Sequence, residues 1–287
     1  MVEHLELWRK AGKVGALALA TGVSMARPGQ SLIDIAEEVE KVIRTEGALP
    51  SFPVNLSIDV QAAHYTPSPE DGRRLRDGEV LKVDVGAQID GYASDNAATV
   101  EVGSSRHAAL LGATRDALES GSAVLRGGMD TRAVSQAIER AIHARGLKPI
   151  VDLSGHTIER YLLHAGKSIP NSAGQPPARL EVGEVVAVEP FATNGQGHIH
   201  DGPFGNIMRF RTEPPADREP ELASLFTRFR TLPFCLRWVP DPEVRTLVLR
   251  RRKFLQTYPV FLETGGGLVS QAEKTFLLLP DGAETLT

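Results

Sequence analysis

The stretch RPGQSLIDIAEEVEKVIRTEGALP, residues 27–50, recurs without gaps as RGGMDTRAVSQAIERAIHARGLKP, residues 126–149. In both copies a glycine turn precedes apolar residues at helical spacing, and a second glycine ends the helical pattern. Ser31 and Asp130 stand where helix N-caps belong. The repeat therefore predicts two helices that begin and end in equivalent ways.

A strand pattern repeats as well. LRDGEVLKVDVG, residues 75–86, matches LEVGEVVAVEPF, residues 180–191, and a turn with glycine opens each alternating run. The alternation places Asp84 in one copy and Glu189 in the other on the face opposite their apolar neighbours. One acid in each repeat indicates two half-domains that face each other across a polar cleft. The alternative is chance similarity between two unrelated helix–strand units.

The composition is that of a soluble globular protein. The chain has 287 residues, of which 41% are hydrophobic and 24% charged, enough for one large core or two small ones. A net charge of -4 and a pI near 6.1 give no overall basic field for nucleic acid or an anionic membrane. The single cysteine, Cys235, excludes an internal disulfide and a thiolate metal cage. With no apolar run long enough to cross a membrane near residue 1, these features predict a cytoplasmic protein.

The first acidic strand is followed by a D-G dipeptide at residues 90–91, which predicts a hairpin turn. If Ala87 pairs with Tyr92, Asp84 lies directly opposite Asp95. Two opposed carboxylates repel each other unless a cation lies between them, so this register predicts a divalent ion. Taken alone, Asp95 could also be a residue that merely ends its strand.

Three further candidates are ambiguous when each is considered alone. His156 follows Gly155, which allows close approach of the backbone, but a lone histidine is more often a satisfied core or surface residue. His164 lies two helical turns later or, if the chain turns, on the same face of the cleft. Glu273 lies in or just before an apolar strand, where an unpaired glutamate is costly, although a strand end in water is the alternative.

The donor types indicate the kind of metal site. Oxygen-rich sites with one imidazole suit manganese, iron, cobalt or zinc better than a structural thiolate zinc. Four carboxylates carry too much charge for one divalent ion, whereas two ions that share bridging carboxylates balance it. The sequence therefore predicts two divalent metal ions (Co, Mn, Fe or Zn) as cofactors.

Six separated motifs resemble the type II methionine aminopeptidases, in their short archaeal-style form. In chain order they are FPVNLSIDVQAAHYTP (52–67), KVDVG (82–86), SDNAAT (94–99), GHTIERYLLHAGKSIPN (155–171), VAVEPFAT (186–193) and SQAEKT (270–275). TLPFCLRW (231–238) resembles a further family segment. The resemblance implies an α+β pita-bread fold, with two pseudo-symmetric α/β halves around a curved antiparallel sheet and an inserted helical subdomain. It also implies one catalytic domain over residues 1–287, with the insertion at residues 206–256.

The resemblance assigns a role to each metal ligand. Asp84 would bind one ion, Asp95 and Glu273 would bridge both ions, and His156 and Glu189 would bind the other. Glu189 would also be the general base that takes the proton of the attacking water.

The resemblance assigns the substrate site as well. His64 and His164 match two cleft histidines, which contact the scissile amide and stabilise the tetrahedral oxyanion. The methionine pocket and its rim would be lined by Phe52, Leu163, Phe191 and Tyr258. Ala272 and Lys274 stand where the family usually has phenylalanine and histidine, which changes the surroundings of Glu273 without removing a ligand.

The implied function is metal-dependent hydrolytic removal of the N-terminal methionine from nascent proteins. Water activated by two metal ions would attack the first peptide bond. The expected partners are nascent polypeptide N-termini, with no membrane and no specific nucleic acid, and the protein is expected to be a monomer. Two alternatives are a non-catalytic relative of the same fold that binds RNA or protein, and an Xaa-Pro peptidase. The first would typically have lost metal ligands, and the second usually carries an additional N-terminal domain.

Two other features invite a functional interpretation. Arginine is abundant from Arg209 to Lys253, including residues 250–252. Such runs are usually solvated helix faces, and transient docking on ribosomal RNA is the alternative. His198, His200 and Asp201 could be mistaken for a metal site, but we expect them to face water in a glycine-rich loop.

Overall fold

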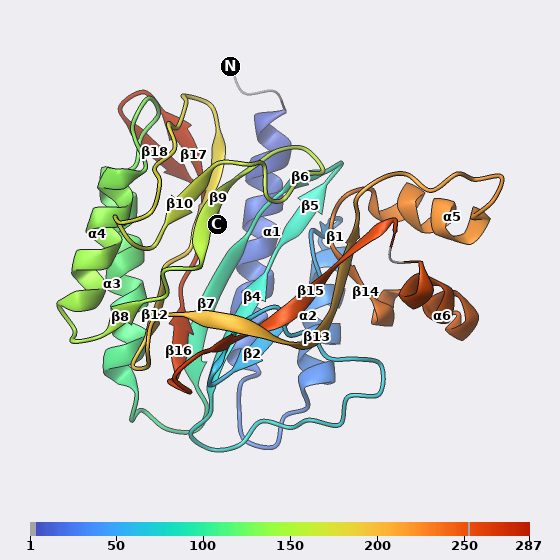
Figure 1. The fold of residues 1–287 in the computed structure, drawn as a ribbon, viewed down its shortest axis with the longest axis horizontal. Coiled ribbons are helices and arrows are strands. Elements are labelled where there is room, and N and C mark those ends of the chain that lie inside the picture. Colours follow the sequence, from blue (N-terminus) through green and yellow to red (C-terminus); the bar gives the residue numbers. More distant parts are fainter. Residues whose placement is uncertain (1–3, 252) are drawn as a thin grey trace.

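The computed structural model describes residues 4–251 and 253–287 and shows antiparallel sheets that curve around the centre of the molecule, with helices outside them (Figure 1). The helices of the two halves are α1 (Leu5–Ser24), α2 (Leu32–Thr45), α3 (Ala108–Val124) and α4 (Arg132–His143). Helices α1 and α2 pack together, as do α3 and α4. No helix within these described residues combines the length and apolar character that a membrane span requires.

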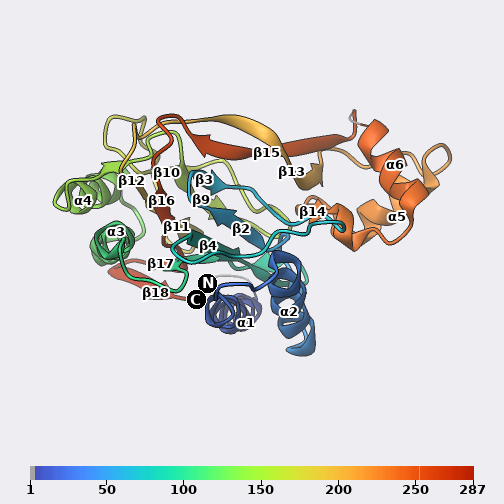
Figure 2. The ribbon, with the colours of Figure 1, turned by 90° about the horizontal axis from the view of Figure 1, so that it is seen from below.

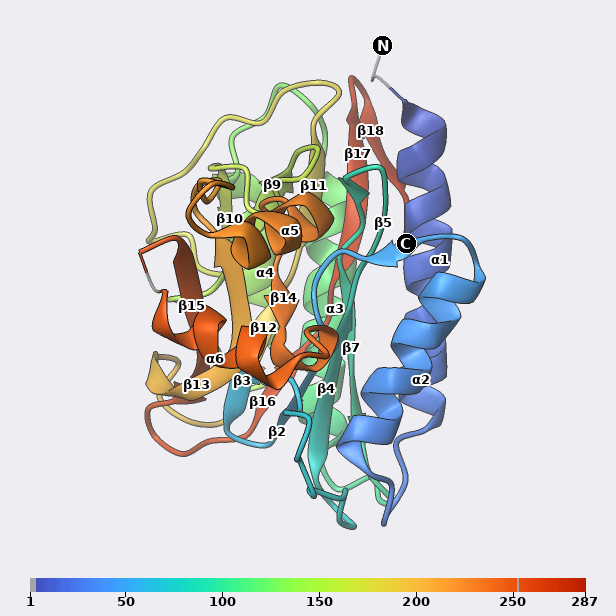
Figure 3. The same ribbon diagram turned by 90° about the vertical axis from the view of Figure 1, so that its right-hand side faces the viewer.

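The first half contributes seven strands. They are β1 (Leu49–Pro50), β2 (Asn55–Ile58), β3 (Gln61–Ala63), β4 (Val80–Val85), β5 (Ala87–Ile89), β6 (Tyr92–Ala93) and β7 (Asn96–Glu101). Strands β2, β4 and β7 form one antiparallel sheet in that order, and β1, β5 and β6 form another. Figure 3 shows α1 and α2 on one side of β4 and β7. The apolar faces of these helices and strands form the core of the first half.

The second half repeats this plan, but one of its two sheets has more strands. Its strands are β8 (Lys148–Pro149), β9 (Ser154–Ile158), β10 (Ser168–Pro170), β11 (Val185–Val188), β12 (Phe191–Thr193), β16 (Val269–Gln271), β17 (Lys274–Leu279) and β18 (Gly282–Thr285). The larger sheet has the order β10-β9-β11-β17-β18, and the smaller one β16-β12-β8. Side chains of α3, α4, β11 and β17 form a second apolar core.

The sequence repeat is also a structural repeat. The Gly29 amide donates to the Leu75 carbonyl at 2.8 Å, and the Gly128 amide donates to the Leu180 carbonyl at 2.8 Å. Both glycines have left-handed backbone, with φ of 84° and 79°. Equivalent glycines thus join equivalent turns to equivalent strands, and the alternative of chance similarity is wrong.

The helix N-caps are only partly as predicted. The Ser31 hydroxyl accepts a hydrogen bond from the Asp34 amide at 3.4 Å, which confirms the first cap. The second helix begins one residue later than expected, so its cap residue is Thr131 rather than Asp130. The Asp130 carboxylate still accepts from the Arg132 amide at 2.7 Å and satisfies one free donor of the first turn.

The predicted hairpin exists, but the predicted register is wrong. Tyr92 pairs with Ile89 rather than with Ala87, because residues 90 and 91 alone form the turn. Their φ angles of 50° and 85° fit the tight two-residue turn that a D-G dipeptide favours. Asp84 therefore lies opposite Ala97 and not opposite Asp95. A shift of two residues keeps side chains on the same face, so the expectation that both acids face the cleft does not depend on this error.

The two halves join at Ala97 and Glu273. The Ala97 amide donates to the Glu273 carbonyl at 3.2 Å, and the Glu273 amide donates back to the Ala97 carbonyl at 2.9 Å. This isolated bridge lies between β7 of the first half and the start of β17 in the second. Glu273 is therefore fixed at the seam between the halves, one strand away from Asp84.

A third group of elements covers the cleft from the other side. They are β13 (Ile199–Phe210), α5 (Pro220–Phe229), β14 (Phe234–Cys235), the 3-10 helix η1 (Leu236–Trp238), α6 (Pro242–Arg250) and β15 (Leu255–Glu263). Their sheet has the order β14-β13-β15-β3 and so reaches the first half through β3. Figure 2 shows α5 and α6 at the opposite end of the molecule from α3 and α4. With its two related halves, this is the predicted α+β architecture.

The close packing of α1 gives a test of the fold. An added Cβ at Gly12 would lie 2.1 Å from the Leu286 carbonyl oxygen, whereas one at exposed Gly72 would meet nothing within 4 Å. We expect Gly12→Ala to lower the free energy of unfolding by about 1–3 kcal/mol through overpacking, although alanine favours a helix. Gly72→Ala should change it by less than about 0.5 kcal/mol. Urea unfolding followed by circular dichroism measures both, and equal effects would contradict this packing.

Candidate metal centre

Side chains from distant parts of the chain meet in one pocket of about 180 Å³. Strand β4 presents one acid and the segment between β6 and β7 a second, while β9 presents an imidazole. The third acid directly follows β11, and the fourth directly precedes β17. In chain order these side chains are Asp84, Asp95, His156, Glu189 and Glu273. The structure thus brings together all five residues expected to bind metal.

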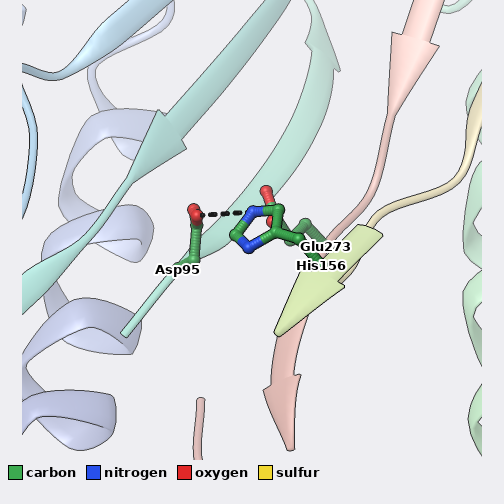
Figure 4. A group of neighbouring side chains, drawn as sticks. All are labelled: Asp95, His156 and Glu273. Carbon is green, nitrogen blue, oxygen red and sulfur yellow. Dashed lines mark ion pairs between the residues drawn. The ribbon is translucent and has the colours of Figure 1, made fainter. Parts of the chain in front are cut away.

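Three of the five are closest together. Asp95, His156 and Glu273 each present one ligand atom, and these atoms all lie within 4.8 Å of one another (Figure 4). The His156 Nε2 atom lies 3.5 Å from Asp95 Oδ2 and 3.6 Å from Glu189 Oε1. A single imidazole nitrogen therefore faces two carboxylates.

The four acids have strongly perturbed electrostatics. Burial raises the pKa of Asp84, Asp95, Glu189 and Glu273 well above the usual range, and for three of them, all but Asp95, the neighbouring acids raise the pKa further. Within residues 4–251 and 253–287, no lysine or arginine forms an ion pair with any of the four. Ionised carboxylates packed in this way require a cation between them.

A buried lysine nearby does not supply that cation. Lys82 precedes Asp84 by two residues on β4, and its ammonium donates to the carbonyls of Asp59 and Val269 at 3.0 and 2.8 Å. Burial lowers the pKa of Lys82 to about 7. Its donors bind backbone oxygens, so the charge of the acid cluster stays uncompensated.

His156 is arranged as a neutral ligand. Burial lowers its pKa to about 4, so the ring carries no charge near neutral pH. Its Nδ1 lies 3.3 Å from the Thr157 carbonyl, a contact that fits a proton on Nδ1. Nε2 then keeps a free lone pair directed at the acids.

The donor set fits divalent cations. Asp84 Oδ1 is buried without a hydrogen-bond partner among the described residues. Gln271 Nε2 donates to Glu273 Oε2 at 3.2 Å, the kind of contact that orients a carboxylate ligand. Four carboxylates and one imidazole nitrogen are the oxygen-rich, mixed ligands expected for manganese, iron, cobalt or zinc.

Two more histidines flank the acids. The His164 ring centroid lies 4.3 Å from that of His156, because the chain turns back between Glu159 and Leu162. The turn confirms the second of the two placements expected for His164. His164 is exposed to solvent at the cleft, yet its pKa is lowered well below the usual range, first by desolvation and then by nearby His156 and Arg209. It is therefore neutral near pH 7.

His64 closes the other side of the pocket. Its ring packs 5.2 Å from Tyr258 and 4.5 Å from Phe261, measured between centroids. Burial, then the nearby His164, lowers the pKa of His64 to about 4. Its Nδ1 is buried without a hydrogen-bond partner among the described residues. A neutral imidazole whose nitrogen has no partner can form a hydrogen bond with a bound ligand.

Apolar side chains complete the pocket. The four residues expected to hold a methionine side chain all line it and are buried: Phe52, Leu163, Phe191 and Tyr258. All eleven residues named from the sequence thus share one pocket, while their individual roles stay predictions. The structure adds eight more lining residues: Asn55, Ala63, Asp152, Leu153, Ser154, Ile207, Pro233 and Phe261.

Some of these additions had a signal in the sequence. Asn55 and Ala63 lie within the motif of residues 52–67, and Pro233 lies within that of residues 231–238. Asp152 had no such signal, because it lies outside the quoted motifs and reaches the pocket only through the fold. Its Oδ2 accepts from the Ile199 amide at 2.9 Å.

The residues that the sequence analysis discussed but did not assign to the site lie outside the pocket. His198, His200 and Asp201 are exposed, as expected, but the last two are in strand β13 rather than in a loop. Ala272 belongs to the apolar core of the second half, and Lys274 is exposed. Neither of these two side chains lines the acid cluster.

Comparison with known proteins agrees with this geometry. Residues 6–210 match metallopeptidase family M24. The methionine aminopeptidase of Pyrococcus abyssi (strain GE5 / Orsay) is 41% identical over 97% of this chain and 97% of its own. A thermophilic Arx1 superposes with a TM-score of 0.86 at 20% identity, over 100% of this chain and 91% of that chain. The methionine aminopeptidase of Thermotoga maritima superposes with a TM-score of 0.73 at 22% identity, over 100% and 97%. At these identities the two structures show the fold alone.

Two related halves with buried acids at their seam define the class: a pita-bread metallopeptidase, as the resemblance implied. The chain belongs to metallopeptidase family M24, with full-length relatives that are methionine aminopeptidases. The predicted fold class, family and enzyme class are thereby confirmed.

Uncompensated acids make stability depend on pH when metal is removed. Each acid has a folded-state pKa above its unfolded value near 4, so the folded protein holds these protons more tightly. We therefore expect the carboxyls' contribution to the free energy of unfolding of chelator-treated protein to fall as pH rises above about 5, through the window between the two pKa values. The lowered pKa values of His64, His156 and Lys82 contribute in the opposite direction, so the carboxyl contribution is isolated by comparison with a variant that lacks one acid. Saturating manganese should oppose this loss, by about 2.7 kcal/mol at a hundredfold excess over Kd.

The control for this experiment is Asp84→Asn. It removes one titrating acid and should make the pH dependence of the metal-free protein shallower. Urea unfolding between pH 5 and 8 measures both proteins. Equal slopes of stability against pH for the two metal-free proteins would contradict the electrostatics described.

Proposed function

We propose that the protein removes the N-terminal methionine from nascent polypeptides in the cytoplasm, acting as a monomer with two bound divalent ions. The observation that carries the proposal is a cluster of four carboxylates and one neutral imidazole, with no basic side chain among the described residues to balance it, in a pocket that also has apolar walls. The 41% identity to a methionine aminopeptidase over nearly the whole chain supports the substrate class.

Five residues would hold the ions. In this proposal Asp84 would bind one ion, His156 and Glu189 would bind the other, and Asp95 and Glu273 would be shared by the two. The position of Glu273 at the seam between the halves supports a bridging role, because its backbone is fixed by both. A pair of divalent ions held there would lower the pKa of a water molecule and polarise a carbonyl oxygen.

Neighbouring side chains handle the proton and the developing charge. Glu189 would be the general base in this proposal, because its carboxylate lines the pocket beside His156, where it can accept the proton of the attacking water and return it to the leaving amine. His164, beside His156 at the cleft, donates a hydrogen bond to the oxyanion. His64 orients the peptide from the opposite wall. Because both rings are neutral, each offers one donor without adding positive charge that would weaken metal binding.

The pocket accounts for selection of the first residue. Phe52, Leu163, Phe191 and Tyr258 are apolar walls on a cavity of about 180 Å³, too small for a folded partner. An apolar pocket discriminates by roughly 1–3 kcal/mol for each methylene. Methionine should therefore be preferred over smaller side chains, and the second substrate residue should have to be small to enter the narrow cleft.

Peptide hydrolysis tests this function against its alternatives. With manganese or cobalt added, we expect release of methionine from Met-Ala-Ser and little cleavage of Xaa-Pro peptides. Free methionine measured by chromatography reports the rate. Cleavage mainly before proline would favour the Xaa-Pro peptidase, and no hydrolysis by metal-saturated protein would favour the non-catalytic relative.

Glu273→Gln tests the two-ion arrangement. Loss of a bridging charge should leave the fold intact but reduce turnover to background and lower the metal stoichiometry below two. Isothermal titration calorimetry with manganese measures the stoichiometry, and Glu119→Gln, on the exposed face of α3, is the matched control. Retained activity in metal-repleted Glu273→Gln would remove the two-ion assignment.

The segment 206–256 is proposed as an inserted subdomain of the single catalytic domain. It has its own apolar core around Phe229, Phe234 and Trp238, which supports this division. Several of its arginines serve that fold internally: for example, Arg251 pairs with Glu219 at 3.0 Å. Arg252 lies outside the described residues. We therefore propose that the basic run is mainly a solvated face, with ribosomal RNA docking as the alternative.

Ribosome binding distinguishes these two interpretations. Arg211 and Arg250 are exposed, so Arg211→Glu with Arg250→Glu reverses two accessible charges. We expect the natural protein and this variant to co-sediment with ribosomes to the same extent at physiological salt. Arginine-dependent co-sedimentation that weakens steeply with salt would instead favour docking on RNA.

A further inference from the structure

A buried ion pair connects α2 to the segment after β14. Arg237 Nη2 donates to Glu40 Oε1 at 2.8 Å, and Arg237 Nη1 donates to Glu40 Oε2 at 3.1 Å. The Trp238 indole donates to Glu40 Oε2 at 2.6 Å. The side chains of Arg237 and Glu40 are only 4% and 2% exposed, so this pair lies in the interior. Two parallel hydrogen bonds fix its geometry.

The remaining donors of Arg237 bind the segment that follows His64. Arg237 Nε donates to the Pro67 carbonyl at 2.9 Å, and Nη2 donates to the Thr66 hydroxyl oxygen at 3.1 Å. The Thr66 hydroxyl in turn donates to the Val54 carbonyl at 2.7 Å. A single guanidinium thus contacts residues two and three positions after His64, while Glu40 balances its charge.

His64 needs such restraint. Its φ is 67°, in the left-handed region that few side chains other than glycine adopt. Strained backbone of this kind persists only where neighbouring contacts fix it. Strand β13 provides one such contact, because the Thr66 amide donates to the Gly205 carbonyl at 3.3 Å. Gly205 also packs so closely that an added Cβ would lie 1.9 Å from the His64 carbonyl oxygen.

We propose that Arg237 is a positioning residue that holds His64 in the cleft, and that Glu40 holds Arg237. This inference rests on the proposed function, in which His64 orients the scissile peptide. Arginine suits the task because its planar group binds a carboxylate with one edge and still reaches the Thr66 and Pro67 oxygens. Lysine keeps the charge but has no fork with which to make these contacts at once. Through this pair, a helix of the first half and the proposed insertion both fix a substrate-binding side chain.

A double-mutant cycle tests the proposal. Arg237→Lys should lower kcat on Met-Ala-Ser by about tenfold to a hundredfold, the effect expected from a small displacement of a positioned group. KM and manganese stoichiometry should change little. In a His64→Ala background the same substitution should lower kcat by less than about twofold, because residues that act as a unit are not additive. Additive effects of the two substitutions would overturn the proposal.

Arg251→Lys is the matched control. Arg251 also pairs with a glutamate of the same segment, Glu219, at 3.0 Å, but has no hydrogen bond to the His64 segment. Its conservative replacement should leave kcat unchanged in both backgrounds. A fall in kcat equal to that of Arg237→Lys would show that any altered arginine of the insertion disturbs catalysis, which would also overturn the assignment.

A second measurement does not depend on turnover. In protein labelled with 15N-histidine, Glu40→Gln should move the ring resonances of His64, assigned with His64→Ala, and leave those of exposed His143 in place. Unchanged His64 resonances would contradict the proposal. If the natural protein shows no peptidase activity, the proposed function fails, while this spectrum still reports whether the buried pair positions His64.

Discussion

Repulsion among four carboxylates, two buried and two of intermediate exposure, is the constraint around which the rest of the molecule is arranged. Each acid has a raised pKa because it is desolvated, and Asp84, Glu189 and Glu273 also because other acids lie nearby. An isolated chain gains nothing from such an arrangement, so folding energy from elsewhere must maintain it. The apolar cores of the two halves supply that energy. A cluster that is unfavourable without cations is therefore a site prepared to bind them.

The internal repeat explains how separate acids reach one point. Asp84 lies near the end of β4 and Glu189 directly follows the equivalent strand β11, so the relation between the halves places them on opposite sides of a common seam. Glu273 lies on that seam, where paired hydrogen bonds with Ala97 join the halves. One relation between two similar units thus fixes several ligands at once. A change in the angle between the halves would separate the ligands, which links the packing at the seam to metal binding.

The sequence predicted the fold and most of the residues that line the pocket, but it predicted less well how the strands pair. The repeat and the spaced motifs indicated which residues meet, because each has a recognisable pattern. The hairpin register was wrong by two residues, since a D-G dipeptide marks a turn without stating how many residues it contains. Asp152 was not found, because it reaches the pocket only through the tertiary fold and has no periodic signal. Residues within a repeat or a motif could therefore be predicted, whereas a residue that reaches the pocket only through long-range packing could not.

Two clusters of charged side chains in this protein differ in whether other residues of the chain balance their charge. Glu40 is as deeply buried as the metal-centre acids, yet Arg237 and Trp238 bind both of its oxygens. Its charge is balanced within the chain, and replacing such a pair with apolar groups often leaves stability unchanged. The acids around His156 have no balancing cation, and Asp84 retains an unpartnered oxygen in the described structure. Evolution can tolerate that imbalance only where something outside the chain corrects it. The degree of internal compensation, rather than burial alone, therefore distinguishes the carboxylate that holds the fold together from those that we propose bind metal.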